Sequence, residues 1–245
     1  LFYFNQFIIA STRQEARVWT IKANTEHFLE WKDSYPIKTS DIHTEADSET
    51  ITSQQVLIEW MLNKVNLLDI ISNFIVFKTD DKWRKIKILC RYQQFRAVNK
   101  AIAKLSNPSL SQNDKWGIIW HTQGSGKSLT MIFLIRKFRK TEEWRKYKII
   151  FLTDRTDLQR QIWETAKTIG ETIYPQENQR NTIENIQIEI ASDTSNIVNA
   201  MIHKFQEKDE SEKDAYVKEI KLLPELNNSP NILLLIDEAH RSHAG

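Results

Sequence analysis

The stretch HTQGSGKS, residues 121–128, decides the fold of this chain. It follows a short apolar run, WGIIWH (116–121), and leads into a run with helical spacing, SLTMIFLIRKFRK (128–140). A strand, a glycine-rich turn and a helix in this order form the context that a phosphate-binding loop requires. Gly124 and Gly126 would let backbone N–H groups converge on phosphate oxygens, where the start of the helix adds partial positive charge. The pattern therefore predicts a phosphate-binding turn.

The side chains of this loop carry the expected chemistry. Lys127 would place its ammonium against the β- and γ-phosphates of a nucleotide, and the Ser128 hydroxyl would ligate Mg²⁺. His121 stands where the loop pattern normally begins with a glycine, but the later GSGKS is intact. The expected nucleotide contacts in the loop are Thr122, Gln123, Gly124, Ser125, Gly126, Lys127 and Ser128.

A second candidate site follows the apolar run NILLLIDE (231–238). Asp237 would hold Mg²⁺ directly or through water, and Glu238 would take a proton from the attacking water. Carboxylates at the end of a parallel strand lie where open α/β sheets bind ligands. Together with the lysine and serine of the loop, this pair predicts a two-part NTPase site with Lys127, Asp237 and Glu238 as its catalytic residues.

A third motif, RYQQFRAVNKAI (91–102), precedes the loop. An amide side chain can form paired hydrogen bonds with an adenine edge. Gln94 is therefore the candidate for adenine recognition, with Tyr92 or Phe95 available to stack on the base. The alternative is that this stretch is only the exposed start of an amphipathic helix.

Apolar runs that alternate with helical runs predict an α/β domain with a parallel sheet covered on both faces. A helix is expected at 157–169, and a surface helix and loop in the charged stretch 206–230. The expected strands are 116–121, 148–154, 183–190 and 231–238.

The aromatic-rich N-terminal part predicts a small α+β unit. Partial alternation favours strands at 1–11 and 16–23, and NTEHFLEWKD (24–33) has the spacing of a helix with Phe28, Leu29 and Trp31 on its apolar face. EWK within it has the Glu-x-Lys spacing of a nuclease site, but a helical position argues against that role. A polar connector (36–53) and a helical pair from Gln54 to Phe77 are expected to follow.

Composition and charge bound the class of protein. The 245 residues suffice for one or two domains, and the single cysteine, Cys90, favours a reducing cytoplasm. No apolar run approaches the ~20 residues that cross a bilayer, so no membrane partner is expected. Residues 86–170 carry 17 Lys and Arg against 6 Asp and Glu, which fits a phosphate ligand or nucleic acid. The basic run within them, at 136–148, is as typical of a solvated helix face as of a nucleic-acid contact.

Three motifs in the same order resemble a known family. HTQGSGKSLT, LTDRTDLQRQI and LLLIDEAHRS resemble motifs I, Ia and II of superfamily 2 helicase-like motors, and are most similar to the motor-and-cleavage (R) subunit of type I restriction enzymes. RYQQFRAVNKAI resembles that family's adenine-recognising segment. The resemblance implies a RecA-like P-loop NTPase domain with a central parallel sheet over 86–245. The end of a nuclease domain (1–35) and a linker with a helical connector (36–85) would precede it.

The resemblance also implies a function. A complete R subunit would use ATP and Mg²⁺ to pump double-stranded DNA in the cytoplasm, and would cleave unmodified DNA together with methylation and specificity subunits. By position, Thr153, Asp154 and Arg155 would lie near the DNA backbone, unless they only end a strand and cap a helix. His240 and Arg241 would couple nucleotide state to a neighbouring motor domain.

The same resemblance leads us to expect a piece of a longer protein. The nuclease carboxylates would lie before Leu1, and a second motor domain with the catalytic arginines would follow Gly245. An arginine supplied from outside contributes a factor of about 10³–10⁵ to phosphoryl transfer. This chain alone is therefore expected to bind ATP and Mg²⁺ but to hydrolyse ATP very slowly.

Other classes of protein remain open at this point. The same motifs serve superfamily 2 RNA helicases and DNA translocases unrelated to restriction, and competition between duplex DNA and RNA would separate them. The basic middle segment alone would fit a non-catalytic nucleic-acid-binding module, in which Glu238→Gln would change no activity. A small-molecule kinase fits poorly, because the DEAH sequence follows a later strand.

Overall fold

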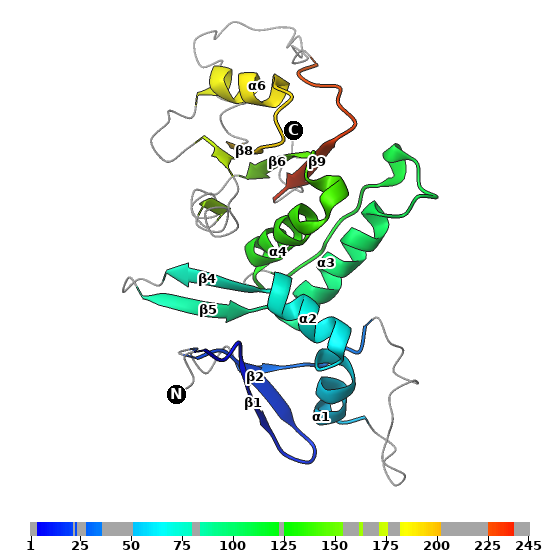
Figure 1. Ribbon diagram of the computed structural model, residues 1–245, viewed down its shortest axis with the longest axis vertical. Helices are drawn as coiled ribbons and strands as arrows, with labels where there is room; N and C mark the ends of the chain where they lie inside the picture. The colour runs from blue at the N-terminus through cyan, green and yellow to red at the C-terminus, as the bar shows by residue number, and fades with distance from the viewer. Residues whose placement is uncertain are drawn as a thin grey trace, which may run out of the picture. The chain divides into compact units, whose positions relative to one another are not determined.

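The computed structural model describes the ten stretches 4–21, 23, 28–35, 51–79, 84–122, 125–153, 162–163, 172–175, 182–201 and 225–237 (Figure 1). The chain divides into two units, residues 1–137 and 138–245, with the boundary inside helix α4 (Lys127–Lys140).

The first unit begins with a three-stranded antiparallel sheet in the order β1-β2-β3. Its strands are β1 (Ile8–Ser11), β2 (Ala16–Trp19) and β3 (Leu29–Glu30). The two predicted N-terminal strands are therefore confirmed, within narrower bounds.

The helix predicted at 24–33 is wrong where the structure describes it. Leu29 pairs with Val18 across the sheet, and the Phe28 ring stacks on Trp19 with ring centroids 4.5 Å apart. Cross-strand aromatic packing of this kind outweighs a helical spacing read from few residues. Glu30, of the Glu-x-Lys sequence, therefore lies on a strand, and it forms an ion pair with Lys32 at 3.1 Å.

A capped helical segment follows in this unit. Thr52 and Gln55 form a reciprocal capping box at its start, and the Asn63 side chain accepts a hydrogen bond from the N–H of Val65. The helical elements are α1 (Ser53–Val56), the π-helical turn η3 (Leu57–Met61) and α2 (Lys64–Asn73).

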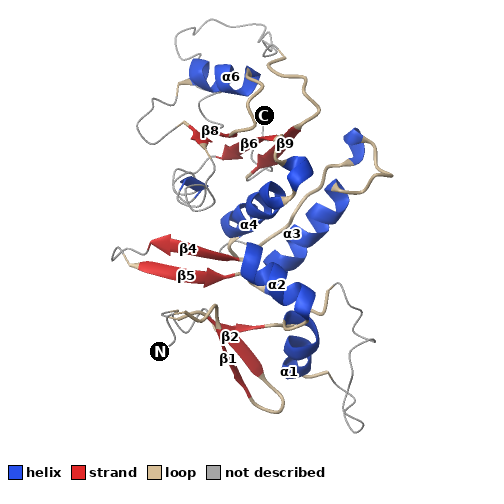
Figure 2. Ribbon diagram, in the orientation of Figure 1, coloured by secondary structure: helices blue, strands red, loops and turns tan. Residues whose placement is uncertain are grey.

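The predicted helical pair is confirmed up to Asn73 and wrong beyond it. The next residues form β4 (Ile75–Thr79), which pairs antiparallel with β5 (Lys85–Leu89), as Figure 2 shows in red. Ile75 and Val76 are β-branched, and branched side chains favour a strand where a partner strand is at hand.

Aromatic side chains form the core of the first unit. The Trp60 ring lies 4.9 Å from both Trp31 and Phe95, and Phe74 lies 4.7 Å from Phe95. These rings come from the segment after β3, from the π-helical turn, from the end of α2 and from helix α3 (Tyr92–Leu105). This core therefore joins the N-terminal sheet to α3, the helix that carries the predicted adenine-recognising segment.

A four-stranded parallel sheet in the order β7-β8-β6-β9 forms the second unit. The central strand β6 pairs parallel with β8 on one side and with β9 on the other. The strands are β6 (Lys148–Thr153), β7 (Ile173–Tyr174), β8 (Ile197–Met201) and β9 (Ile232–Ile236). This arrangement confirms the α/β class, the parallel sheet and the predicted strands at 148–154 and 231–238.

The strand predicted at 183–190 is wrong, because these residues form helix α6 (Ile183–Ala191). Thr182 caps the helix by accepting a hydrogen bond from the N–H of Asn185. Ile186 and Ile190 pack on the sheet beside Val198, whereas Ile188, which fits only the alternating pattern, is exposed. The strand that does lie in the sheet here, β8, was not predicted.

The strand predicted at 116–121 is also wrong. The segment pairs with no strand among the residues that the structure describes, and the Trp120 side chain is 90% exposed. An apolar run becomes a strand only where a neighbouring strand accepts its backbone hydrogen bonds. Two other predictions, the helix at 157–169 and the loop at 206–230, fall largely outside the described residues.

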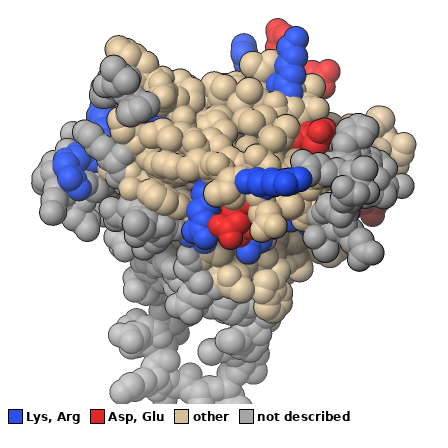
Figure 3. Space-filling model, turned by 90° about the horizontal axis from the view of Figure 1, so that it is seen from below, with Lys and Arg blue, Asp and Glu red and all other residues tan. Residues whose placement is uncertain are grey.

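The basic run at 136–148 turns largely inward. Arg136 donates to the carbonyl oxygen of Ile75, and buried Arg139 donates to three carbonyl oxygens in its own unit. Lys137 pairs with Asp69, and Lys148 is buried. On the face that Figure 3 shows, charged side chains stand scattered among uncharged ones. Four cations of the run therefore hold the fold together rather than forming an exposed face.

Within the described part of the chain, no helix is both long and apolar enough to span a bilayer.

Lys148→Met is expected to lower the free energy of unfolding by about 2 kcal/mol, because the change removes a buried charged donor from several partly buried acceptors. The side chain is 3% exposed, and its Nζ donates to the Glu189 carbonyl (2.6 Å), Asn196 Oδ1 (2.9 Å) and Ser192 Oγ (3.1 Å). Urea unfolding measures the loss. A change below about 0.5 kcal/mol would show that water replaces these contacts.

Candidate nucleotide-binding site

The first group of predicted site residues lies in the turn that opens α4, in the first unit. Gly126 has φ +85°, a conformation that favours glycine, and a Cβ atom there would lie 2.6 Å from Gln94 Nε2. Ser125 donates from both its N–H and its hydroxyl to the Thr122 carbonyl, at 3.2 and 2.6 Å. Gln123 and Gly124 lie outside the described residues. The described part of the turn has the tight backbone that close approach of a phosphate requires.

Helix α4 starts at Lys127, one residue before the predicted helical run at 128–140. Lys127 and Ser128 therefore occupy its first turn, and both are partly buried. The first N–H groups of a helix lack partners within the helix and carry partial positive charge, so this end favours an anion. A lysine and a hydroxyl at this position fit a phosphate group with its bound Mg²⁺.

Gln94 joins α3 to the phosphate-binding turn. Its Nε2 donates to the Gly126 carbonyl at 2.9 Å, and its Oε1 accepts from the N–H of Arg91 at 2.8 Å. The side chain is 2% exposed. An amide has one more N–H and one more lone pair, and these are the groups that an adenine edge would use. Recognition of adenine by Gln94 stays a prediction.

The two aromatic candidates of this segment differ in their surroundings. Phe95 is buried in the aromatic core between Trp60 and Phe74, so it is not available to stack on a base. Tyr92 is partly buried at the first position of α3, with its ring 6.5 Å from Trp31. Tyr92 therefore remains the stacking candidate.

His121 occupies the position where the loop pattern begins. Its Nε2 atom is buried and has no hydrogen-bond partner in the part of the chain that the structure describes. Burial and, to a smaller degree, the charge of Lys127 lower the pKa of His121 below its ordinary value of 6.5. A neutral imidazole is therefore favoured beside Lys127.

This lowered pKa makes stability depend on pH. Since the unfolded chain binds the His121 proton more readily than the folded chain, acid favours unfolding. We expect the melting temperature to fall as the pH drops from 7 through 6.5 to about 5.5, and to fall less in His121→Gln. Thermal unfolding of both chains across this range measures the difference. Equal losses in the two chains would assign the acid sensitivity to other groups.

The second group of predicted site residues lies at the carboxyl end of the parallel sheet, in the second unit. Asp237 directly follows β9, is 4% exposed, and donates its backbone N–H to the Leu152 carbonyl of β6 at 2.9 Å. Thr153 ends β6 and is fully buried. Glu238, Asp154 and Arg155 lie outside the described residues. The sheet therefore places Asp237 at the edge where parallel sheets bind ligands, and a DNA contact by Thr153 stays a prediction.

Much of this chain is similar in sequence to known proteins. Residues 93–245 match the family model of the SWI2/SNF2 ATPase. The putative type I restriction enzyme MpnIIP endonuclease subunit, C-terminal part, from Mycoplasma pneumoniae is 32% identical over 191 residues, covering 75% of this chain and 85% of that protein. The chain belongs to the endonuclease (R) subunits of type I restriction enzymes, with a SWI2/SNF2 ATPase segment.

Longer R subunits match this chain throughout. The type I restriction enzyme HindI endonuclease subunit of Haemophilus influenzae is 30% identical, and the match covers the whole chain and 22% of that protein. The putative MjaIXP endonuclease subunit of Methanocaldococcus jannaschii is 27% identical, over the whole chain and 23% of that protein. The chain thus spans less than a quarter of these two R subunits. The family resemblance expected from the motifs is confirmed.

Three contacts of this R-subunit segment could not be predicted from the sequence. The hydrogen bond from Gln94 to Gly126 joins residues that lie in different motifs. Lys137 contacts Asp69 and Asn99 on two other helices. The glycine pattern of the loop predicts the positive φ of Gly126. No sequence pattern predicts the partners of Gln94 and Lys137, because only folding brings these segments together.

Proposed function

We propose that this chain carries the ATP-binding part of an R subunit in which ATP hydrolysis drives DNA translocation before cleavage of unmodified DNA. One observation carries the proposal: a glycine with positive φ, whose missing Cβ leaves room for Gln94, leads directly into a helix that begins with Lys127 and Ser128. The family match supports the same conclusion.

Each residue has a distinct role in this proposal. Lys127 and the first N–H groups of α4 bind the phosphates, and Gln94 and Tyr92 hold the adenine. Ser128 and Asp237 are the residues that would hold Mg²⁺, and Glu238 accepts a proton from the attacking water. Bound ATP supplies the phosphoanhydride bond whose hydrolysis releases the free energy for movement.

The proposed partners are double-stranded DNA and the methylation and specificity subunits of a restriction complex. The curated relatives named above are described as endonuclease subunits of type I restriction enzymes, which favours this proposal over a superfamily 2 helicase unrelated to restriction. Thr153, Asp154 and Arg155 are the proposed contacts with the DNA backbone. Competition between duplex DNA and RNA for the complete complex, at fixed salt, separates the two functions.

Gln94→Ala tests the adenine contact. We expect the preference for ATP over GTP to fall by about tenfold or more, the range that a paired amide–base contact provides. Titration of the chain with a fluorescent analogue of each nucleotide, in the presence of Mg²⁺, measures the ratio of the two dissociation constants. Loss of the bond to Gly126 weakens the binding of both nucleotides alike. The ratio of the two dissociation constants therefore reports only on the contact with the base.

The matched control is Gln93→Ala, which removes the neighbouring, exposed glutamine of the same helix. This variant should keep the wild-type ratio. If Gln94→Ala also kept it, the amide would serve only to hold the turn, and adenine would be recognised elsewhere.

A further inference from the structure

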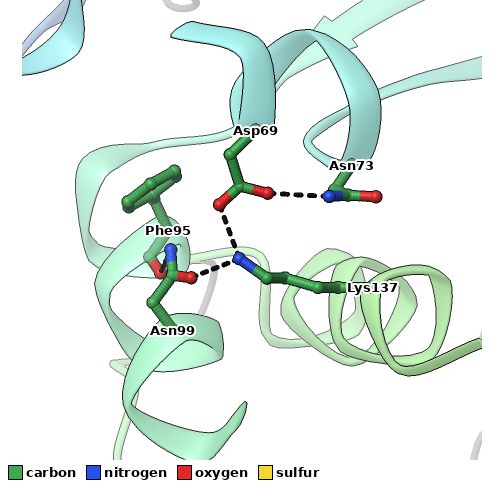
Figure 4. A network of polar contacts seen from close by, with 5 residues as sticks. All are labelled: Asp69, Asn73, Phe95, Asn99 and Lys137. Atoms are coloured by element: carbon green, nitrogen blue, oxygen red, sulfur yellow. Dashed lines mark hydrogen bonds and ion pairs between the residues drawn. The ribbon is translucent and has the colours of Figure 1, made fainter. Parts of the chain in front are cut away.

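A polar cluster joins helices α2, α3 and α4 of the first unit (Figure 4). Lys137 Nζ of α4 lies 2.5 Å from Asp69 Oδ2 of α2 and 2.5 Å from Asn99 Oδ1 of α3. The second oxygen of Asp69 accepts from Asn73 Nδ2 at 2.7 Å, and Asn99 Nδ2 donates to the Phe95 carbonyl at 3.1 Å. Hydrogen bonds or the ion pair thus orient each of these polar side chains.

This cluster lies mostly out of water. The side chains of Lys137 and Asp69 are 19% and 17% exposed, and the ammonium also lies 5.6 Å from the centre of the Phe74 ring. Removing two charges from water offsets much of their attraction, so such a pair adds little net stability. The pair does hold α2 and α4 in one arrangement, because a different arrangement of the two helices would leave a buried charge without its partner.

Among the described residues, hydrogen bonds at two places tie α3 to α4 and to the turn before it. The first lies at their N-terminal ends, where Gln94 donates to the Gly126 carbonyl. The second is the contact of Asn99 with Lys137, about 15 Å further along α4 from Lys127. Two attachments along one helix restrict both sliding and rotation, whereas one attachment leaves rotation free. The ion pair with Asp69 adds α2 as a third support.

We propose that Lys137 is a positioning residue for the phosphate-binding turn: through Asn99 and Asp69 it fixes α4 so that the Gly126 carbonyl meets Gln94 and the first turn of α4 stays formed. Its consequence for nucleotide binding rests on the function proposed above. Lys137 itself touches no nucleotide and acts only through the alignment of α3 with α4.

Amide hydrogen exchange in the ligand-free chain tests the proposal without any nucleotide. Lys137→Met should speed exchange over residues 126–130 by about three- to tenfold, the range expected for one lost hydrogen bond. It should also weaken binding of a fluorescent ATP analogue with Mg²⁺ by a similar factor. Lys137→Arg keeps a donor for both oxygen acceptors and should restore both properties.

Two further variants keep the test decisive. Asn99→Ala removes the link between Lys137 and α3, together with the bond from Asn99 to the Phe95 carbonyl within α3, and keeps the ion pair of Lys137 with Asp69. It therefore reports on the same alignment if Lys137→Met fails to fold. Lys148→Met removes a buried lysine of the second unit, and should lower stability without changing exchange at 126–130.

The proposal would be overturned if Asn99→Ala and Lys137→Met left exchange at 126–130 within twofold of wild type. It would equally be overturned if Lys148→Met had the same effect as Lys137→Met, because the change would then follow general stability. A wild-type chain that bound no nucleotide would refute the proposed function, and the exchange measurement would still decide the role of Lys137.

Discussion

Lys127→Ala is expected to weaken binding of ATP with Mg²⁺ on the order of 100-fold. The ammonium of Lys127 sits in the first turn of α4, where the helix N–H groups already favour an anion. Charge-assisted hydrogen bonds to phosphate are about twice as strong as neutral ones, and alanine removes them without filling their place. Titration calorimetry with a non-hydrolysable ATP analogue measures the loss.

Lys140→Ala is the matched control, because Lys140 is the exposed last residue of the same helix. It should bind the nucleotide like the wild-type chain. If both variants lost affinity equally, general positive charge would explain binding. If neither did, the turn at 121–128 would not be the phosphate site.

Glu238→Gln is expected to slow ATP hydrolysis by about 10²–10⁴-fold and to leave ATP binding nearly unchanged. Glutamine keeps the size of the side chain but cannot accept the proton of the attacking water, and general base catalysis contributes a factor of this size. Phosphate release by the complete restriction complex, with saturating duplex DNA, measures the rate. ATP affinity is measured separately by titration.

The control for this variant is Glu225→Gln, an exposed glutamate that precedes β9. It should hydrolyse ATP at the wild-type rate. Unchanged hydrolysis in Glu238→Gln would remove this glutamate from the reaction, whereas a parallel loss of binding would indicate a structural role.

Strong apolar runs made much of the second unit predictable. The strands predicted at 148–154 and 231–238 contain the unbroken apolar runs IIFL and ILLLI, which are typical of strands in a parallel sheet. Residues 183–190 fit a period of two and a period of 3.6 almost equally well. The helix cap at Thr182 and the packing of Ile186 decide between them, and only the second depends on the rest of the fold.

The other predictions of structure failed because they depend on contacts with residues far away in the sequence. Residues 116–121 have the composition of a strand, but a strand also needs a neighbour, which a local pattern does not specify. The basic run at 136–148 suggested a solvated face or a nucleic-acid contact. Its residues Arg139 and Lys148 instead donate to backbone carbonyls of distant segments, which charge alone does not reveal.

The candidate site was predictable where one short segment carries the chemistry. The turn before α4, the helix that starts at Lys127 and the position of Asp237 after a strand all follow from local sequence. The burial of Phe95 and the bond from Gln94 to Gly126 do not, because they depend on how α3 packs against the aromatic core and against the turn.

The proposed function requires that the turn at Lys127 and the carboxylates after β9 bind the same nucleotide. A crystal structure of the chain with Mg²⁺ and a non-hydrolysable ATP analogue tests it most directly. We predict Lys127 against the β- and γ-phosphates, with the Ser128 hydroxyl and the Asp237 carboxylate around the same magnesium ion. A nucleotide bound elsewhere, or Asp237 far from the ion that Ser128 holds, would contradict the account.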